Sequence, residues 1–263
     1  MTAVIVSSAF APFMKDPNPR SEVVTQTVLG ETAIILEQRG DWFSLRREVD
    51  GYVGWSHRGY LKEVSDAEAS SWLGRAIGRA DAAILRDTSG RRIGLPLLAR
   101  VAPVGEFWAL PSGWQGRLDS GTLLPAEDLI RRARKERVID WVVGRFSGSS
   151  YFWGGITPWG VDCSGLVQTA FAARGVNLPR DSSVQASCGD PVATDAMEAD
   201  DLAFFSDNGE RITHVAFLGD DETLVHSTLA CGGFVVESWR PGTRAARLRD
   251  QLVTVRRIPE PRG

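Results

Sequence analysis

The sequence predicts an α+β protein in which two small β-barrels precede a domain of helices packed on an antiparallel sheet. Short β-favouring runs separated by glycine-containing turns fill residues 21–124. Apolar residues at helical spacing follow between residues 125 and 175, and alternation of apolar and polar residues returns after residue 200. A block of helices followed by a block of strands is typical of α+β domains. We predict three domains, at residues 1–65, 66–128 and 129–263.

The composition is that of a globular protein without strong charge bias. The 263 residues are 43% hydrophobic and 24% charged, with a formal net charge of -3. Such a chain is not built to hold nucleic acid, and no apolar run approaches the ~18 residues that a membrane-spanning helix needs. Three scattered cysteines, Cys163, Cys188 and Cys231, favour reduced thiols over a zinc site or a disulfide framework. We therefore expect no metal, no cofactor, no nucleic-acid partner and no membrane.

The N-terminal run MTAVIVSSAFAPFMKD bears on location. It ends in small residues but has no basic residue before Lys15, unlike a signal peptide. Together with reduced thiols, this predicts a cytoplasmic protein. A secreted or wall-associated protein is the alternative, and a monomer is the expected state.

Residues 21–62 predict the first barrel. The runs VVTQTVLG, TAIILEQ, WFSLRRE and GYVGW are rich in β-favouring residues and are separated by turns at Gly40 and Gly51. Short strands that close on themselves form a small barrel. The order of these runs resembles the bacterial SH3-like domain through Trp42, Gly51, Tyr52, Gly54 and Trp55.

The remaining chain supplies a second barrel, a helix and a sheet. The runs AAILRD, LPLLARVAPV, EFWALP and GWQGRL predict a second, divergent SH3-like barrel. The segment PAEDLIRRARKERVIDWVVGRF predicts one helix with a solvated charged face. The final runs LAFFSD, HVAFLGD, ETLVHSTL, GFVVESW and LVTVRRIP predict five antiparallel strands packed on helices.

The last domain is organised around residues 151–175. The first half of this stretch, rich in glycine and aromatic residues, predicts a structured loop, and the second half predicts a helix that Asp162 caps and Gly175 ends. Cys163 therefore lies at the helix N-terminus, where the dipole and free N–H groups stabilise a thiolate. A thiol in that place is a candidate nucleophile. The alternative is a small buried hydrophobic side chain.

Only three histidines could serve as a base. His57 lies in a turn of the first barrel and is expected to be exposed. His214 and His226 fall in neighbouring strands joined by a turn near Asp220. If that turn is tight, residues whose numbers sum to about 440 lie opposite each other in the two strands, as 214 and 226 do. The two rings would then lie opposite each other and complete a nucleophile, base and orienting residue. The alternative is two structural histidines.

Several motifs of the last domain resemble those of the NlpC/P60 family of papain-like cysteine peptidases. They are Y-x-W-G-G, G-x-D-C-S-G-L-V-Q, L-P-R-D-S-x-x-Q, D-L-x-F-F and H-V-x-F-L-G, in that order. The resemblance implies a papain-like domain with Cys163 as nucleophile and His214 as general base and acid. It also implies that His226 orients His214 and that Tyr151 helps the Cys163 N–H stabilise the oxyanion.

Two SH3-like barrels before such a domain resemble the subgroup that cleaves γ-D-glutamyl–diamino acid bonds in free murein peptides. The resemblance implies a tri- or tetrapeptide substrate, L-Ala-γ-D-Glu-diamino acid, whose free amine binds at an end of the groove closed by the first barrel. A confined ammonium needs carboxylate or hydroxyl acceptors. The positions implied are Asp162, Ser164, Asp181 and Ser182, with Tyr52 and Glu22 from the barrel; Glu31 competes with Glu22.

Asp162 has two competing roles, because a carboxylate beside the nucleophile raises the thiol pKa and a helix N-cap explains the residue equally well. The predicted function is a cysteine endopeptidase of cell-wall peptide recycling. One alternative is an exported peptidoglycan hydrolase that uses its SH3-like domains for wall targeting. The other is a non-catalytic protein that binds wall peptides.

Overall fold

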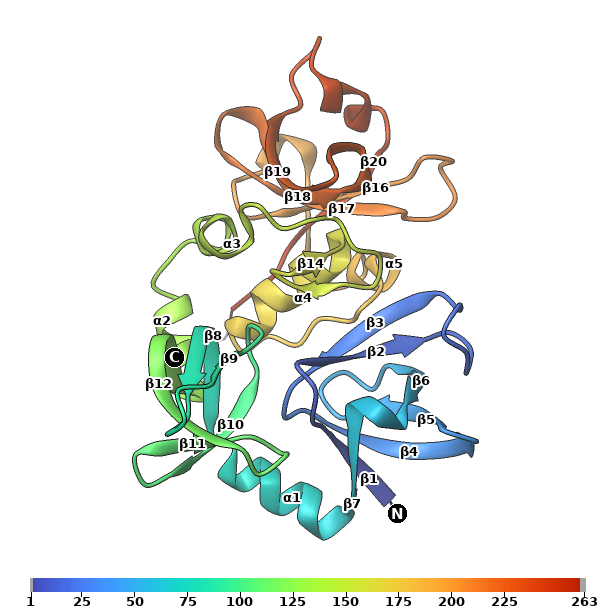
Figure 1. Cartoon of the computed structure of the whole chain (residues 1–263). Coiled ribbons are helices and arrows are strands. Elements are labelled where there is room, and N and C mark those ends of the chain that lie inside the picture. Colours follow the sequence, from blue (N-terminus) through green and yellow to red (C-terminus); the bar gives the residue numbers. More distant parts are fainter. Residues whose placement is uncertain (1, 261–263) are drawn as a thin grey trace. The chain divides into compact units, whose positions relative to one another are not determined.

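The computed structural model describes residues 2–260 and divides into two compact units, one ending at Leu129 and the other beginning at Ile130 (Figure 1). The first unit is almost all strand, and the second combines helices with one large sheet. None of the helices within residues 2–260 is both long enough and apolar enough to cross a membrane.

The first sheet of the first unit has seven strands in the order β3-β2-β6-β5-β4-β1-β7. These are β1 (Thr2–Val6), β2 (Phe10–Met14), β3 (Val23–Val28), β4 (Thr32–Arg39), β5 (Trp42–Arg47), β6 (Val53–His57) and β7 (Leu61–Ser65). The strand runs predicted for this barrel begin at residue 21, whereas the earlier part of the predicted domain 1–65 already supplies its first two strands, β1 and β2. Val4, Phe13 and Phe43 are buried at its centre. Gly54 lets β6 approach β2, since a Cβ there would lie 2.9 Å from that of Phe13.

The second sheet of this unit has the order β10-β11-β12-β8-β9, and β10 also pairs with β8. Its strands are β8 (Gly78–Arg86), β9 (Arg92–Gly94), β10 (Arg100–Val104), β11 (Phe107–Ala109) and β12 (Gln115–Pro125). The extra pairing closes the sheet on itself around a core that includes Leu85, Val101 and Leu123. The predicted second barrel therefore exists as a separate sheet.

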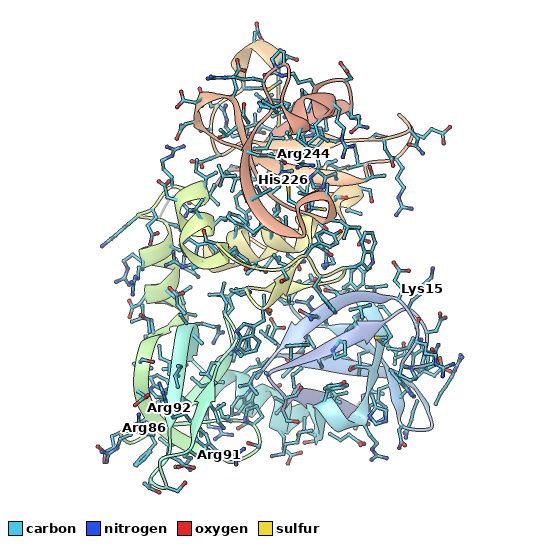
Figure 2. All side chains as sticks on the ribbon, turned by 45° about the horizontal axis from the view of Figure 1, so that its top comes forward. Lys15, Arg86, Arg91, Arg92, His226 and Arg244 are labelled. Carbon is cyan, nitrogen blue, oxygen red and sulfur yellow. The ribbon has the colours of Figure 1, made fainter. Side chains whose placement is uncertain are left out.

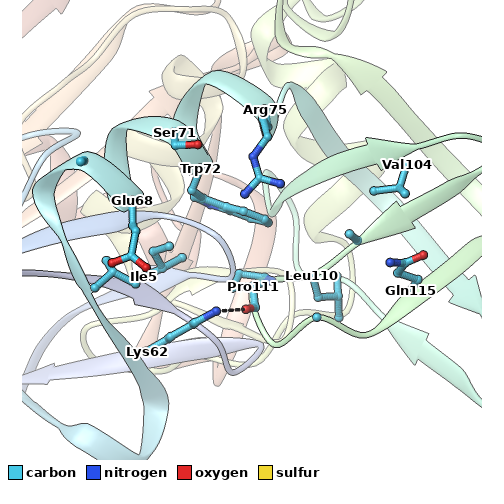
Figure 3. A pocket seen from close by; sticks show the side chains of 14 residues that line it. Ile5, Lys62, Glu68, Ser71, Trp72, Arg75, Val104, Leu110, Pro111 and Gln115 are labelled. Atoms are coloured by element: carbon cyan, nitrogen blue, oxygen red, sulfur yellow. Dashed lines mark hydrogen bonds between the residues drawn. The ribbon is translucent and has the colours of Figure 1, made fainter.

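Helix α1 (Asp66–Arg75) joins the two sheets. Ser65 and Glu68 form a capping box at its start. The Trp72 indole donates to the carbonyl of Gly30 at 2.7 Å, and the Arg100 amide donates to that of Leu29 at 2.8 Å. Beside α1 the two sheets leave a hollow of about 480 Å³, which Lys62 spans by donating to the carbonyl of Pro111 (Figure 3). The two sheets thus pack as one unit.

The predicted long helix is two helices, α2 (Ala126–Ala133) and α3 (Val138–Phe146). The break has a side-chain cause. The buried Arg174 guanidinium donates to the carbonyls of Ala133 and Glu136 at 2.6 and 3.1 Å. In a continuous helix these carbonyl groups would accept hydrogen bonds from backbone amides of the following turn. Arg137 then adopts an extended backbone before α3 begins.

The second unit is built on a six-stranded antiparallel sheet in the order β15-β20-β16-β17-β18-β19. The strands are β15 (Asp190–Val192), β16 (Leu202–Phe205), β17 (His214–Leu218), β18 (Thr223–Thr228), β19 (Gly233–Ser238) and β20 (Leu252–Arg257). Five of them were predicted, and β15 is the addition. Helix α4 (Cys163–Ala173) packs on β17, where Phe171 stacks on Phe217 with ring centroids 6.0 Å apart. The α+β architecture is confirmed.

Shorter elements complete the chain. A two-stranded ribbon pairs β13 (Ile156–Thr157) with β14 (Gly160–Val161), and α5 (Ser182–Gln185) follows α4. The 3-10 helices are η1 (Arg58–Tyr60), η2 (Thr194–Ala196), η3 (Asp220–Glu222), η4 (Leu229–Cys231) and η5 (Arg244–Arg249).

Candidate active site

The N-terminus of α4 is fixed by Asp162, as predicted. One carboxylate oxygen accepts from the Gly165 amide at 2.7 Å, and the other accepts from the Gly154 amide at 2.8 Å. The loop before the helix can approach this closely because Gly165 has no Cβ. A Cβ at that position would collide with the carbonyl of Gly155. Cys163 is the first residue of the helix and is 8% exposed.

Arg180 pairs with Asp162 beside the thiol. Its guanidinium donates to the Asp162 carboxylate at 2.5 Å and to the Ser164 hydroxyl at 2.7 Å, and Arg180 is only 3% exposed. A buried carboxylate needs such a partner. Sequence reasoning gave Arg180 no role, although it stands in the quoted L-P-R-D-S motif. Asp162 and Ser164 are therefore already members of a buried polar cluster.

Burial sets the protonation of Cys163. Loss of solvent and the nearby Asp162 raise the pKa of the Cys163 thiol to about 12, although the Val215 and Ser164 amides facing the sulfur and the charge of Arg180 oppose them. In the free protein, burial therefore opposes the thiolate that the helix dipole favours. Within residues 2–260, the sulfur makes no hydrogen bond to His214.

Tyr151 lies close to the candidate nucleophile. It bridges to Val161, two residues before Cys163, and its amide donates to the carbonyl of Gly232 at 2.8 Å. Burial raises the pKa of its phenol, and the Cys163 and Asp162 charges add to that effect. The phenol is thus a neutral donor at physiological pH, as an oxyanion contact requires.

His214 and His226 are joined directly. His214 begins β17, one residue before Val215, and its Nε2 lies 2.7 Å from Nδ1 of His226 in β18. The pairing differs from the predicted one, since Phe217 pairs with Val225 and Leu218 with Leu224. Continuing this register places His226 opposite Ala216, diagonal to His214 but on the same face of the sheet.

The turn between these strands explains the shift. It is not a tight two-residue turn, because it contains η3, in which Asp221 and Glu222 have positive φ values of 52° and 55°. The third histidine, His57, is half-buried and not exposed as predicted. Its Nδ1 accepts from the Gly59 amide at 3.1 Å, and its ring packs edge-on against Trp42.

A carboxylate and a guanidinium extend the histidine pair. His226 Nε2 lies 2.9 Å from Oε1 of Glu237 in β19, and Arg244 of η5 contacts both oxygens of that carboxylate. Figure 2 shows His226 and Arg244 close together in the second unit. Sequence reasoning missed Glu237 and Arg244, because their proximity depends on the pairing of β18 with β19.

His214 is neutral in the free protein. Burial and the neighbouring His226 lower its pKa to about 3, which the charge of Glu237 only partly offsets. A neutral imidazole beside a neutral thiol can act as a general base. Contacts for proton transfer are often long in a free enzyme and tighten when substrate binds.

The other predicted substrate-binding residues are divided between the units. Asp181 caps α5 without a side-chain cap bond, Ser182 begins that helix, and both side chains are half-buried. Asp181 lies close enough to Arg180 to raise the pKa of that guanidinium, although burial opposes this. Tyr52 and Glu22 belong to the first unit, where Glu22 pairs with Lys15 at 3.7 Å. Their part in binding an amine stays a prediction.

Glu31, the competitor of Glu22, has structural partners. Its carboxylate accepts from the Thr27 hydroxyl at 2.6 Å and from the Val28 amide at 3.0 Å. Among the described residues no cluster of three or more His, Cys, Asp or Glu side chains could hold a metal ion.

We expect alkylation of Cys163 by iodoacetamide to accelerate about tenfold per pH unit between about pH 6 and pH 9. The thiol pKa is raised, so thiolate forms only as the pH climbs toward it. The measurement is the rate of mass increase at Cys163 in the free protein. The Cys163→Ala variant gives the background from Cys188 and Cys231. A rate already constant from about pH 6 would instead reveal a preformed thiolate–imidazolium pair.

Comparisons of the sequence identify two known domains. The profile of the NlpC/P60 family matches residues 148–250, and that of the bacterial dipeptidyl-peptidase SH3 domain matches residues 13–56. Both agree with the resemblances seen in the sequence. The first match contains Cys163, His214 and His226.

Two curated relatives match across much of the chain. The γ-D-glutamyl-L-lysine dipeptidyl-peptidase of Bacillus subtilis (strain 168) is 30% identical over 232 residues, which cover 78% of this chain and 72% of the relative. Dipeptidyl-peptidase 6 of Lysinibacillus sphaericus is 27% identical over 86% of this chain and 92% of the relative.

A solved structure matches the fold. The crystal structure of an NlpC/P60 family protein from Bacillus cereus ATCC 10987 has a TM-score of 0.76 and 20% identity, with 98% of this chain and 100% of that chain covered. This likeness confirms the predicted fold class, with SH3-like barrels before an α+β peptidase domain.

Proposed function

This chain belongs to the NlpC/P60 family of cysteine peptidases, and on that premise we propose that it hydrolyses the γ-D-glutamyl–diamino acid bond of wall-derived peptides with a free N-terminal L-alanine. The observation that carries the proposal is the match to a γ-D-glutamyl-L-lysine dipeptidyl-peptidase. At 232 residues it is longer than either unit, so it extends across both. The diamino acid is L-lysine or a close analogue.

Acylation begins with Cys163 and His214 as neutral groups. His214 takes the thiol proton while the sulfur attacks the γ-carbonyl carbon of D-glutamate, which forms an S–C bond and an oxyanion. The Cys163 amide and the Tyr151 hydroxyl donate to that oxyanion. The intermediate collapses when the C–N bond breaks and His214 returns its proton to the departing amine of the diamino acid. A thioester on Cys163 remains.

Deacylation uses the same base. His214 takes a proton from a water molecule, whose oxygen attacks the thioester carbonyl, and it then protonates the departing sulfur. The dipeptide L-Ala-γ-D-Glu leaves with a new γ-carboxylate. His226 keeps the His214 ring in place through the contact at 2.7 Å between Nε2 and Nδ1.

We further propose an amine pocket near α4 and α5, where Asp162 and Asp181 bring two carboxylates near the one guanidinium of Arg180. Ser164 and Ser182 add hydroxyl acceptors. An ammonium bound there would also offset the effect of Asp162 on the thiol pKa.

We expect the protein to release dipeptide from free L-Ala-γ-D-Glu-L-Lys and to leave intact sacculi almost untouched, because a wall peptide's alanine amine is blocked by its amide link. Chromatography of both digests measures the difference. A cytoplasmic recycling enzyme accounts for this preference. Comparable release from sacculi would instead support the exported wall hydrolase, and cell fractionation would decide its location.

A further inference from the structure

We propose that Glu237, held by Arg244, is a positioning residue that fixes which ring nitrogens of His226 and His214 carry protons. The inference deepens the proposed peptidase reaction and rests on it for its kinetic consequence. It adds a carboxylate and a guanidinium behind the two histidines.

Three adjacent strands supply this relay, which we define as His214, His226 and Glu237. Each strand gives one member: β17, β18 and β19 in turn. In the β18–β19 register Val235 lies opposite His226, so Glu237 stands two residues further along on the same face. His226 is 1% exposed, and its two nitrogens contact only the other two members of the relay within residues 2–260.

The carboxylate determines the tautomer of His226. An ionised carboxylate only accepts hydrogen bonds, so His226 must present Nε2–H to Glu237. A neutral His226 then has a lone pair on Nδ1, and His214 must donate its Nε2–H to that lone pair. The remaining nitrogen, Nδ1 of His214, is left unprotonated. It is the only one of the four ring nitrogens that can take the thiol proton.

Arg244 keeps Glu237 ionised and correctly turned. It donates to Oε2 at 3.0 Å and also contacts Oε1, the oxygen that faces His226. Burial opposes ionisation, but the hydrogen bonds from His226 and Arg244 outweigh it and lower the pKa of the Glu237 carboxyl. The side chain of Glu237 is 14% exposed and that of Arg244 is 39% exposed, so Arg244 closes the relay toward solvent.

Glutamine at position 237 would no longer fix the order of protons. Arg244 donates toward both oxygen positions of Glu237, so either orientation of the amide sets its NH₂ group against an Arg244 N–H. Where the NH₂ group faces His226, His226 carries its proton on Nδ1 and donates to Nε2 of His214. His214 then holds its own proton on Nδ1 and cannot accept one from Cys163, so only part of the protein is competent.

Nitrogen-15 NMR of histidine-labelled protein tests the relay without any substrate. The chain has three histidines, and a His57→Gln variant identifies the signals of the other two. We expect Nε2–H on both His214 and His226 in the wild-type protein, and a mixture of Nε2–H and Nδ1–H forms of both in the Glu237→Gln variant. A wild-type His226 that carries its proton on Nδ1 would overturn the inference, whether or not the variant folds.

Kinetics with free tripeptide test the consequence. We expect Glu237→Gln to lower kcat by at least about tenfold with little change in KM, and Glu237→Asp to recover part of the loss because it restores an acceptor-only group. Glu222→Gln is the matched control, since Glu222 pairs with Arg249 at 2.9 Å but touches neither histidine. Wild-type kcat in Glu237→Gln would refute the positioning role. If the protein shows the expected tautomers but cleaves no tripeptide, the proposed function is refuted and the proton order of the relay still holds.

Discussion

Replacement of Cys163 by alanine is expected to abolish release of L-Ala-γ-D-Glu from the free tripeptide, with a loss of about 10⁴-fold or more in kcat. In the proposed reaction the sulfur forms the covalent bond to the γ-carbonyl carbon, and no other described group of the site can replace it. His214 has no thiol left to deprotonate, and water lacks the fixed position of the sulfur at the start of α4. Chromatographic assay of the dipeptide measures the loss.

The matched control is Cys188→Ala. Cys188 is another free cysteine of the second unit and is half-buried, but it follows α5, and its sulfur contacts the carbonyl of Val184 at 3.6 Å. We expect this variant to keep wild-type activity. Dipeptide release that survives in Cys163→Ala, or that disappears in Cys188→Ala alone, would assign the reaction to another residue.

Acetylation of the substrate's N-terminal amine is expected to lower kcat/KM by about 100-fold or more. The acetyl group removes the positive charge that the proposed pocket at Asp162 and Asp181 would attract. A site built around a charged hydrogen bond rejects the analogue that lacks it more strongly than an apolar pocket rejects a missing methyl group.

The control peptide carries its acetyl group on the lysine side chain. This change removes one positive charge and adds the same bulk, but at the far end of the substrate. We expect the control peptide to be cleaved much faster than the N-terminally acetylated one. Equal cleavage of both acetylated peptides and of the unmodified peptide would rule out the amine pocket while leaving Cys163 as the nucleophile.

The parts of the site that follow local patterns could be predicted. Asp162 before an apolar helical stripe predicts an N-cap, and the structure shows the expected bond to the Gly165 amide. The contact between His214 and His226 was also expected, because the two residues lie in neighbouring strands. The observed register differs from the predicted one by two residues, and a shift by two leaves both side chains on the same face of the sheet.

The parts that depend on distant contacts could not be predicted. Arg180 meets Asp162 across 18 residues of chain, and Glu237 becomes a neighbour of His226 only through strand pairing. The split of the predicted long helix depends likewise on Arg174, which follows it by about forty residues. The raised pKa of Cys163 depends on its burial, which its place at the start of a helix does not reveal.

Cleavage of the free tripeptide in oxygen-18 water, followed by mass spectrometry of both products, tests the central claim most directly. Attack of Cys163 on the γ-carbonyl and hydrolysis of the thioester place one heavy oxygen in the γ-carboxylate of L-Ala-γ-D-Glu and none in the released diamino acid. Heavy oxygen in free L-alanine, with the diamino acid still attached to D-glutamate, would contradict the account, because it would show that a different bond is cut.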